Sequence, residues 1–138
     1  MYRIAKEFGF SASHQLPHLG PEHKCARLHG HNYTVTVILS SPALDERGFI
    51  VDFAELAPVK AFLEACWDHR HLNDCVPVPP TSEHLARFLF NWCRDNLPLP
   101  DVQALDAVRV SESHSTWAEY RPGPPGSPST GGATGGTS

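Results

Sequence analysis

The stretch that decides the fold is HGHNYTVTVILS, residues 29–40. From Tyr33 to Leu39 its odd-numbered side chains are apolar and alternate mostly with polar ones, which predicts a strand with one buried face. A looser alternation over residues 2–10 predicts a second strand, and residues 48–51 are expected to form a short third one. The sequence therefore predicts a protein built around a sheet.

Between the first two predicted strands lies a segment without periodicity, residues 11–28. It contains Pro17, Gly20 and Pro21, which interrupt regular structure. We expect a long loop here, and loops of this length often carry functional side chains.

Two helices are expected after these strands. The first follows Asp52, a suitable capping residue, but Pro58 fits poorly inside a helix, so the regular helix should start later or kink there. The second covers residues 82–96, where apolar side chains recur with the helical period, and Thr81 is its expected N-cap.

Two more strands, near residues 105–112 and 115–121, complete the predicted layout. The order strand, strand, helix, helix, strand, strand indicates the α+β class, with a four-stranded antiparallel sheet and two helices on one face. The folded domain is expected to span residues 1–121. Residues 122–138 contain four Pro and six Gly and are expected to form a disordered tail.

Composition limits the classes of function. The formal net charge is −4 and no run of Lys or Arg occurs, so neither nucleic acid nor an anionic membrane is favoured as a partner. No export signal or membrane-length apolar run is visible, which predicts a cytoplasmic protein with cysteine thiols. Cys66 and Cys93 lie on apolar helix stripes and are expected in the core. The nine histidines favour metal or proton chemistry.

His29 and His31 are the first candidates for metal ligands. Residues at i and i+2 of a strand point to the same face, so the two imidazoles project together and suit a zinc ion. His14 is the best candidate for a third ligand, although His18 or His23 would serve on spacing alone. Three nitrogens leave a fourth position open, as in catalytic zinc sites. The alternative is a pair of surface histidines at a strand end.

Three other residues are candidates for acid–base chemistry. Cys25 lies four residues before His29, and a nearby metal would lower the pKa of its thiol and make a thiolate available. It could instead be a fourth zinc ligand or an inert apolar residue. Asp68 and His69 are adjacent, and a carboxylate can orient an imidazole for proton transfer. They could also be solvated turn residues, and His71 competes for the same role.

Glu112 continues the apolar face of Val108 and Val110 at the end of a predicted strand. A carboxylate on an inward face needs a partner. A ligand with paired N–H donors, such as the amino-pyrimidine edge of a pterin, would supply one. The alternative is a strand end that has already reached water.

Six sequence blocks occur in order within residues 4–121: FSASHQLPH, HKCARLHGHNY, IVDFAEL, WDHRHLND, PTSEHLA and VSESHSTWAEY. With these blocks the chain resembles the 6-pyruvoyl-tetrahydropterin synthase and 6-carboxytetrahydropterin synthase superfamily. It is most similar to the bacterial branch of queuosine (7-deazaguanine) biosynthesis.

The resemblance implies a role for each candidate. It implies zinc ligands at His14, His29 and His31, a thiolate base at Cys25, an acid–base pair at Asp68 and His69, a pterin anchor at Glu112, and nearby substrate contacts at Thr81 and Ser82. It also implies an assembly in which three subunits close a β-barrel, two such rings stack into a homohexamer, and active sites lie between subunits. Such an assembly would cover the exposed edges of the sheet.

The implied reaction converts 7,8-dihydroneopterin triphosphate into 6-carboxy-5,6,7,8-tetrahydropterin, with release of acetaldehyde and triphosphate and no external redox cofactor. Three residues separate Cys25 from His29, which matches the carboxy-forming members. One alternative is the pyruvoyl-forming reaction on the same fold. Another, of a different class, is a non-catalytic zinc-binding module that Cys25 closes.

Overall fold

A computed structural model describes residues 1–123 of the 138-residue chain. Its sheet has five strands in the order β3-β1-β2-β4-β5. The strands are β1 (Tyr2–His14), β2 (His29–Ser41), β3 (Arg70–His71), β4 (Leu105–Ser113) and β5 (Thr116–Tyr120). The helices are α1 (Ala57–Cys66) and α2 (Ser82–Asn96). The predicted tail lies, from residue 124 onward, outside the described residues.

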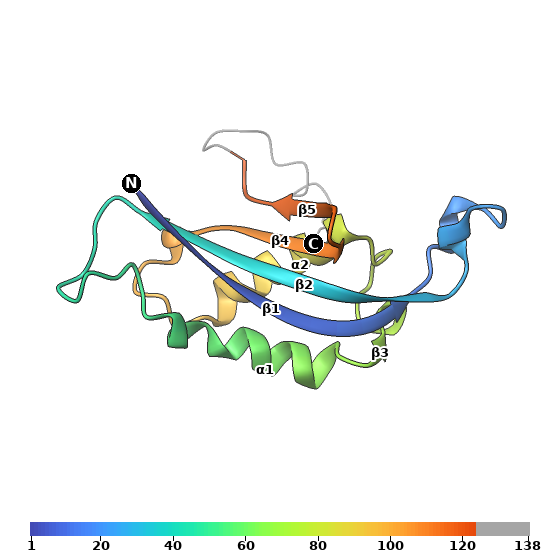
Figure 1. The fold of residues 1–138 in the computed structure, drawn as a ribbon, viewed down its shortest axis with the longest axis horizontal. Coiled ribbons are helices and arrows are strands. Elements are labelled where there is room, and N and C mark those ends of the chain that lie inside the picture. Colours follow the sequence, from blue (N-terminus) through green and yellow to red (C-terminus); the bar gives the residue numbers. More distant parts are fainter. Residues whose placement is uncertain (124–138) are drawn as a thin grey trace.

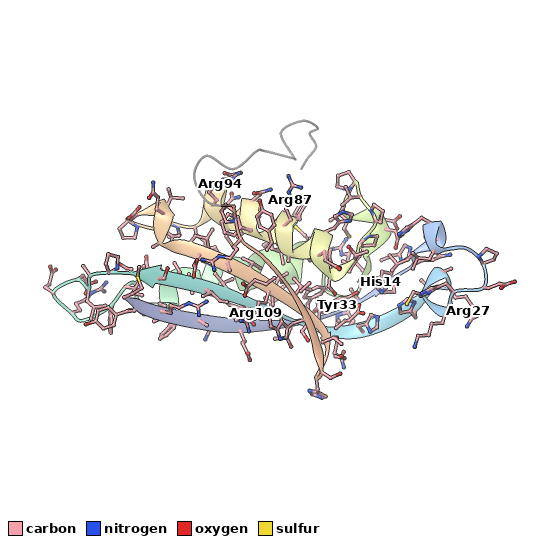
Figure 2. All side chains as sticks on the ribbon, turned by 90° about the horizontal axis from the view of Figure 1, so that it is seen from above. His14, Arg27, Tyr33, Arg87, Arg94 and Arg109 are labelled. Carbon is pink, nitrogen blue, oxygen red and sulfur yellow. The ribbon has the colours of Figure 1, made fainter. Side chains whose placement is uncertain are left out.

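The molecule consists of two layers, a sheet and a pair of helices that cover one of its faces (Figures 1 and 2). β1 and β2 form a long curved hairpin whose residues pair from Tyr2↔Ser41 to His14↔His29. The loop between them lies at the end of the hairpin away from the N-terminus (Figure 1). This confirms the α+β class and the single helical face.

The core fills the space between the two layers. Side chains of alternating strand residues pack against the apolar stripes of both helices. Its largest fully buried members include Trp67, Tyr33, Leu39, Leu63 and Leu89. Cys93 is buried in this core as expected, but Cys66 is exposed, contrary to the prediction. Cys66 ends α1, and the next residue, Trp67, is only 1% exposed and packs into the core instead.

The predicted four-stranded antiparallel sheet is wrong in one respect, because the observed sheet is five-stranded and mixed. β3 adds to the free edge of β1 in parallel, through Ala12↔Arg70 and Ser13↔His71. A strand of two residues has no periodicity that a sequence can display. Within the single chain the sheet is open, with β3 and β5 at its edges. The closed β-barrel concerns several chains together and stays a prediction.

β1 continues to His14, so the first part of the predicted loop is strand. Ser11, Ala12 and Ser13 are small and show little contrast between faces, but β2 pairs with them and holds them extended. The short strand expected over residues 48–51 is absent from the described structure. The Asp45 carboxylate instead accepts the backbone N–H groups of nearby loop residues, which makes a turn.

The helix starts follow the capping residues. Asp52 accepts a hydrogen bond from the backbone N–H of Ala54 and begins a short 3-10 turn, and α1 starts only after it. Pro58 thus lies in the first turn of α1, where its missing N–H leaves no bond unmade. Thr81 Oγ1 accepts from His84 N at 3.2 Å, which confirms it as the N-cap of α2. None of the helices in residues 1–123 has the length and apolarity needed to cross a membrane.

Candidate metal centre and active site

Three histidines meet at the end of the long hairpin. His14 ends β1 and pairs directly with His29, which begins β2, and His31 follows two residues later on the same face. Their ligand nitrogens all lie within 4.8 Å of one another. Figure 2 shows His14 beside Tyr33, on the side of the sheet that the helices cover. The structure therefore brings together the three residues named as metal ligands.

The other two candidate ligands lie elsewhere. His18 belongs to a 3-10 turn, Pro17–Leu19, and is exposed. His23 is also exposed, and its Nδ1 accepts a hydrogen bond from the backbone N–H of Cys25. Neither belongs to the histidine cluster, so among the described residues only His14 completes it.

Hydrogen bonds determine which ring nitrogen carries the proton in two of the three histidines. His14 Nδ1 lies 2.8 Å from the carbonyl oxygen of Pro80, and His29 Nδ1 lies 2.7 Å from that of Arg27. Because a carbonyl oxygen only accepts, each Nδ1 must hold the proton and donate it. The Nε2 atoms of neutral His14 and His29 then carry lone pairs, and they face each other at 2.8 Å.

Two facing lone pairs repel unless a cation lies between them. His31 adds a third nitrogen, because its Nε2 is buried and makes no hydrogen bond within residues 1–123. Neutral imidazole nitrogens of this kind suit zinc and other divalent transition metals. The residues present therefore fit a metal ion held by His14, His29 and His31, while the arrangement does not distinguish zinc from its neighbours in the series.

A carboxylate lies next to the cluster. Glu112 Oε2 is 3.4 Å from His31 Nε2 and 3.9 Å from His14 Nε2. It stands where the pairing of β4 with β5 shifts register, between Val110 and Ser113. The inward direction predicted for Glu112 agrees with this position.

Burial dominates the acid–base properties of the cluster. It lowers the pKa of His14 and of His31, and the Glu112 carboxylate acts in the opposite direction on both. Burial and Glu112 together raise the pKa of Tyr33, whose hydroxyl lies 3.2 Å from His14 Nδ1. Burial therefore favours the uncharged form of His14 and of His31, which is the form that binds metal.

The Asp68–His69 pair lies across a cavity from the cluster. Asp68 Oδ2 is 3.0 Å from His69 Nδ1, and both residues are tied to Ser11 by hydrogen bonds of 2.9 Å and 2.6 Å. The Ser11 N–H is the main cause that lowers the pKa of Asp68, and the hydrogen bond from His69 adds to it. One cavity of about 820 Å³ is lined by His31, Glu112, Asp68 and His69 together.

His69 has a left-handed backbone conformation, with φ of 60°. Such a value is uncommon for a residue other than glycine and indicates that the surroundings impose it. The side chain is 83% exposed, so the imidazole is presented to solvent at the cavity and not packed away. The pair therefore lies in a turn that borders the cavity.

The remaining candidates lie outside this cavity. Cys25 is half-buried in a 3-10 turn, Lys24–Ala26, which a hydrogen bond from Leu16 N to Cys25 O holds against the end of β1. Within residues 1–123 Cys25 does not line the cavity that holds His69. Thr81 and Ser82 begin α2 and do not line it either.

Sequence reasoning missed several residues that shape the site. The Pro80 carbonyl holds His14, and no sequence signal identifies a backbone acceptor. Ser11 holds the Asp68–His69 pair, although its place in the FSASHQLPH block was a signal available before the structure. His114 lines the large cavity, and His71 donates to or accepts from Ser13 Oγ at 3.1 Å beside it.

The chain belongs to the 6-pyruvoyl tetrahydropterin synthase family, whose sequence profile matches residues 3–123. A Synechocystis protein named 6-carboxy-5,6,7,8-tetrahydropterin synthase is 38% identical over 126 residues, covering 87% of this chain and 93% of its own length. A Bacillus subtilis protein of the same name is 30% identical, covering 88% and 86%.

Other relatives carry a different name. A Drosophila melanogaster protein named 6-pyruvoyl tetrahydrobiopterin synthase is 30% identical over 127 residues and covers 81% of this chain and 74% of its own length. The solved structure of Caenorhabditis elegans 6-pyruvoyl tetrahydropterin synthase superposes with a TM-score of 0.75 at 24% identity, covering 88% of this chain and 96% of that one. This likeness supports the fold.

Proposed function

We propose that the protein is a zinc-dependent lyase that converts 7,8-dihydroneopterin triphosphate into 6-carboxy-5,6,7,8-tetrahydropterin, with release of acetaldehyde and triphosphate, in 7-deazaguanine (queuosine) biosynthesis. One observation carries the proposal: three imidazole nitrogens converge beside the Glu112 carboxylate, and one of these histidines, His31, shares a cavity with Glu112 and the Asp68–His69 pair. The names of the Synechocystis and Bacillus subtilis relatives support the carboxy-forming branch. The catalytic domain is proposed to span residues 1–121.

The metal is held by His14, His29 and His31. Zinc bound there supplies a Lewis acid that polarises a hydroxyl group of the substrate side chain. The hydrogen bonds from His14 and His29 to backbone carbonyls keep both rings in the tautomer that leaves Nε2 free, as such acceptors do behind the ligands of other metal sites.

Glu112 accepts the paired N–H groups of the pterin ring. A carboxylate that receives two parallel N–H bonds forms a strong and oriented contact. Its position 3.4 Å from His31 Nε2 would orient the ring next to the residues that would hold the metal. Thr81 and Ser82 are assigned a supporting role near the ring.

Asp68 and His69 exchange protons with the substrate. Asp68 accepts the Nδ1–H of His69, which leaves His69 Nε2 facing solvent as the atom that takes up or delivers a proton. Cys25 is proposed as the second base, in its thiolate form. Because Cys25 and His69 do not share a cavity in one chain, we also propose a homo-oligomer, a hexamer in the family's manner, in which neighbouring subunits complete each site.

Product analysis tests the proposed reaction. The zinc-loaded protein is incubated with 7,8-dihydroneopterin triphosphate without a reductase, and acetaldehyde and the pterin are measured by mass spectrometry. Equal amounts of acetaldehyde and carboxytetrahydropterin are expected. Pyruvoyl-tetrahydropterin without acetaldehyde would assign the chain to the second candidate function, which the Drosophila relative favours. If the metal-loaded and correctly assembled protein forms no product, the non-catalytic zinc-binding module becomes the favoured function.

Glu112→Gln separates two roles for that carboxylate. If Glu112 anchors the pterin, the substitution should raise KM for the substrate and leave the metal content unchanged. If Glu112 is a fourth metal ligand, the substitution should lower the metal affinity. Glu64→Gln, an exposed glutamate on α1, is the matched control and should change neither quantity.

A further inference from the structure

Residues 68–73 run beside β1 and carry the Asp68–His69 pair. At one end this segment is tied to Ser11, by Asp68 Oδ1, which accepts the Ser11 N–H, and by the N–H of His69, which donates to the Ser11 carbonyl. In the middle, β3 contributes only two residue pairs with β1. Such a short parallel ladder is a weak determinant of register.

At the other end of the segment, the side-chain amide of Asn73 bonds to the backbone of Gln15 in the way that a neighbouring strand would. Asn73 Oδ1 accepts the N–H of Gln15 at 2.9 Å, and Asn73 Nδ2 donates to the carbonyl of Gln15 at 2.8 Å. Gln15 directly follows His14, at which the pairing of β1 with β2 ends. Asn73 therefore satisfies both polar groups of the backbone next to a proposed metal ligand.

We propose that Asn73 is a positioning residue: it sets the register of residues 68–73 on β1, and so the place of the Asp68–His69 pair relative to the histidine cluster. With Ser11 held at one end and Gln15 at the other, the segment cannot slide along β1. The cavity between His31 and His69 depends on that register, since both side chains line it. The inference rests on the proposed metal site and reaction.

The consequence of losing this contact follows from the geometry. Without the amide, the backbone N–H and carbonyl of Gln15 lose their partners, and the end of β1 that carries His14 loses one of the contacts that hold it. Proton transfer between positioned groups is sensitive to displacements of about 1 Å. We therefore expect the loss of Asn73 to alter turnover and the ligand field of the metal, and substrate binding much less.

The test compares Asn73→Ala and Asn73→Asp with the wild-type chain. Asn73→Asp keeps the acceptor for Gln15 N–H and loses only the donor to the Gln15 carbonyl, and it remains informative if Asn73→Ala does not fold. Asn96→Ala is the matched control, since Asn96 makes one side-chain hydrogen bond, to Trp92 O at the end of α2. The measurements are kcat and KM, the thermal midpoint, and the visible absorption spectrum of the Co²⁺-loaded protein.

Asn73→Ala should lower kcat about tenfold with KM within about twofold, and should change the Co²⁺ spectrum, while Asn96→Ala leaves all three unchanged. Asn73→Asp should fall between Asn73→Ala and the wild type. A lowered thermal midpoint with wild-type kcat and an unchanged spectrum would overturn the inference, because it would mark Asn73 as structural only. If the wild-type chain binds Co²⁺ but makes no product, the proposed reaction fails, and the spectra alone still decide the role of Asn73.

Discussion

Removing the proposed metal should lower the thermal stability of the protein strongly, because the three imidazole nitrogens of the cluster converge as the ligands of one cation would. The Nε2 atoms of His14 and His29 face each other at 2.8 Å while both Nδ1 protons point to backbone carbonyls, and His31 Nε2 is buried without a hydrogen bond from residues 1–123. Burial lowers the pKa of His14 and of His31, so protons replace the cation poorly at neutral pH.

The size of the effect follows from linkage. A metal present at about 1,000 times its Kd stabilises the folded state by about 4 kcal/mol. For a folded region close to the 123 described residues, 1 kcal/mol corresponds to roughly 3–5 °C in the thermal midpoint. We therefore expect chelation to lower the midpoint by about 12–20 °C.

Differential scanning calorimetry at pH 7.5 measures this effect on the zinc-loaded protein, after EDTA, and after zinc is restored. His29→Ala should resemble the chelated protein, and His18→Ala, which lies outside the cluster, should behave like wild type. A midpoint that changes by less than about 2 °C on chelation, with zinc shown to be removed, would refute the reasoning.

The same linkage gives a pH dependence with a definite sign. Protons compete with the metal for the imidazole nitrogens, and the unfolded chain binds them with an ordinary histidine pKa of about 6.5. Because the folded pKa of His14 and of His31 is lowered, the unfolded state binds more protons as the pH falls. The stabilisation should be complete above pH of about 6.5 and should be lost progressively below it.

Three further outcomes concern single side chains. Cys25→Ala should keep the metal and lose turnover, as measured by metal analysis and product formation. Cys66 is exposed, so Cys66→Ala should keep both the metal and the turnover. Loss of metal from Cys25→Ala would support a closed metal site instead. Burial raises the pKa of the Cys93 thiol to about 12. Iodoacetamide at pH 8 should therefore label Cys66 and should not label Cys93 until the chain is unfolded. Labelling of both thiols at equal rates in the native protein would contradict the buried position of Cys93. Leu63→Ala should lower the free energy of unfolding in urea by about 2–5 kcal/mol, since Leu63 is only 1% exposed. The metal stoichiometry should stay unchanged, because Leu63 is distant in sequence from the proposed ligands. A loss below about 0.5 kcal/mol would argue against the described core.

Much of the fold was predictable because it depends on local periodicity. The alternation from Tyr33 to Leu39 identified β2, and the helical period with Thr81 as its cap identified α2. β3 and the last residues of β1 were not predictable from the sequence. These residues are held in strands by pairing with residues far away in the sequence, and their own composition gives no strand signal. The exposure of Cys66 was missed for a related reason: a stripe of apolar residues does not tell where a helix leaves the core.

For the candidate site, the sequence by itself determined that His29 and His31 share a face, because strand geometry makes i and i+2 neighbours. His14 was the preferred third ligand, although spacing alone would have allowed His18 or His23 in its place. The folded chain places His14 in the cluster, because His14 pairs with His29, whereas His18 and His23 lie outside it.

Only the tertiary structure decided the protonation and the register of the site. The proton on His14 Nδ1 is set by Pro80, 66 residues away, and the amide of Asn73 bonds to the backbone of Gln15, 58 residues away. Hydrogen bonds between such distant residues leave no periodic trace in a sequence, because each depends on how whole elements pack and not on local backbone geometry. The candidate ligands can therefore be named from short motifs, while the protonation of their rings depends on how the sheet and the helices pack together.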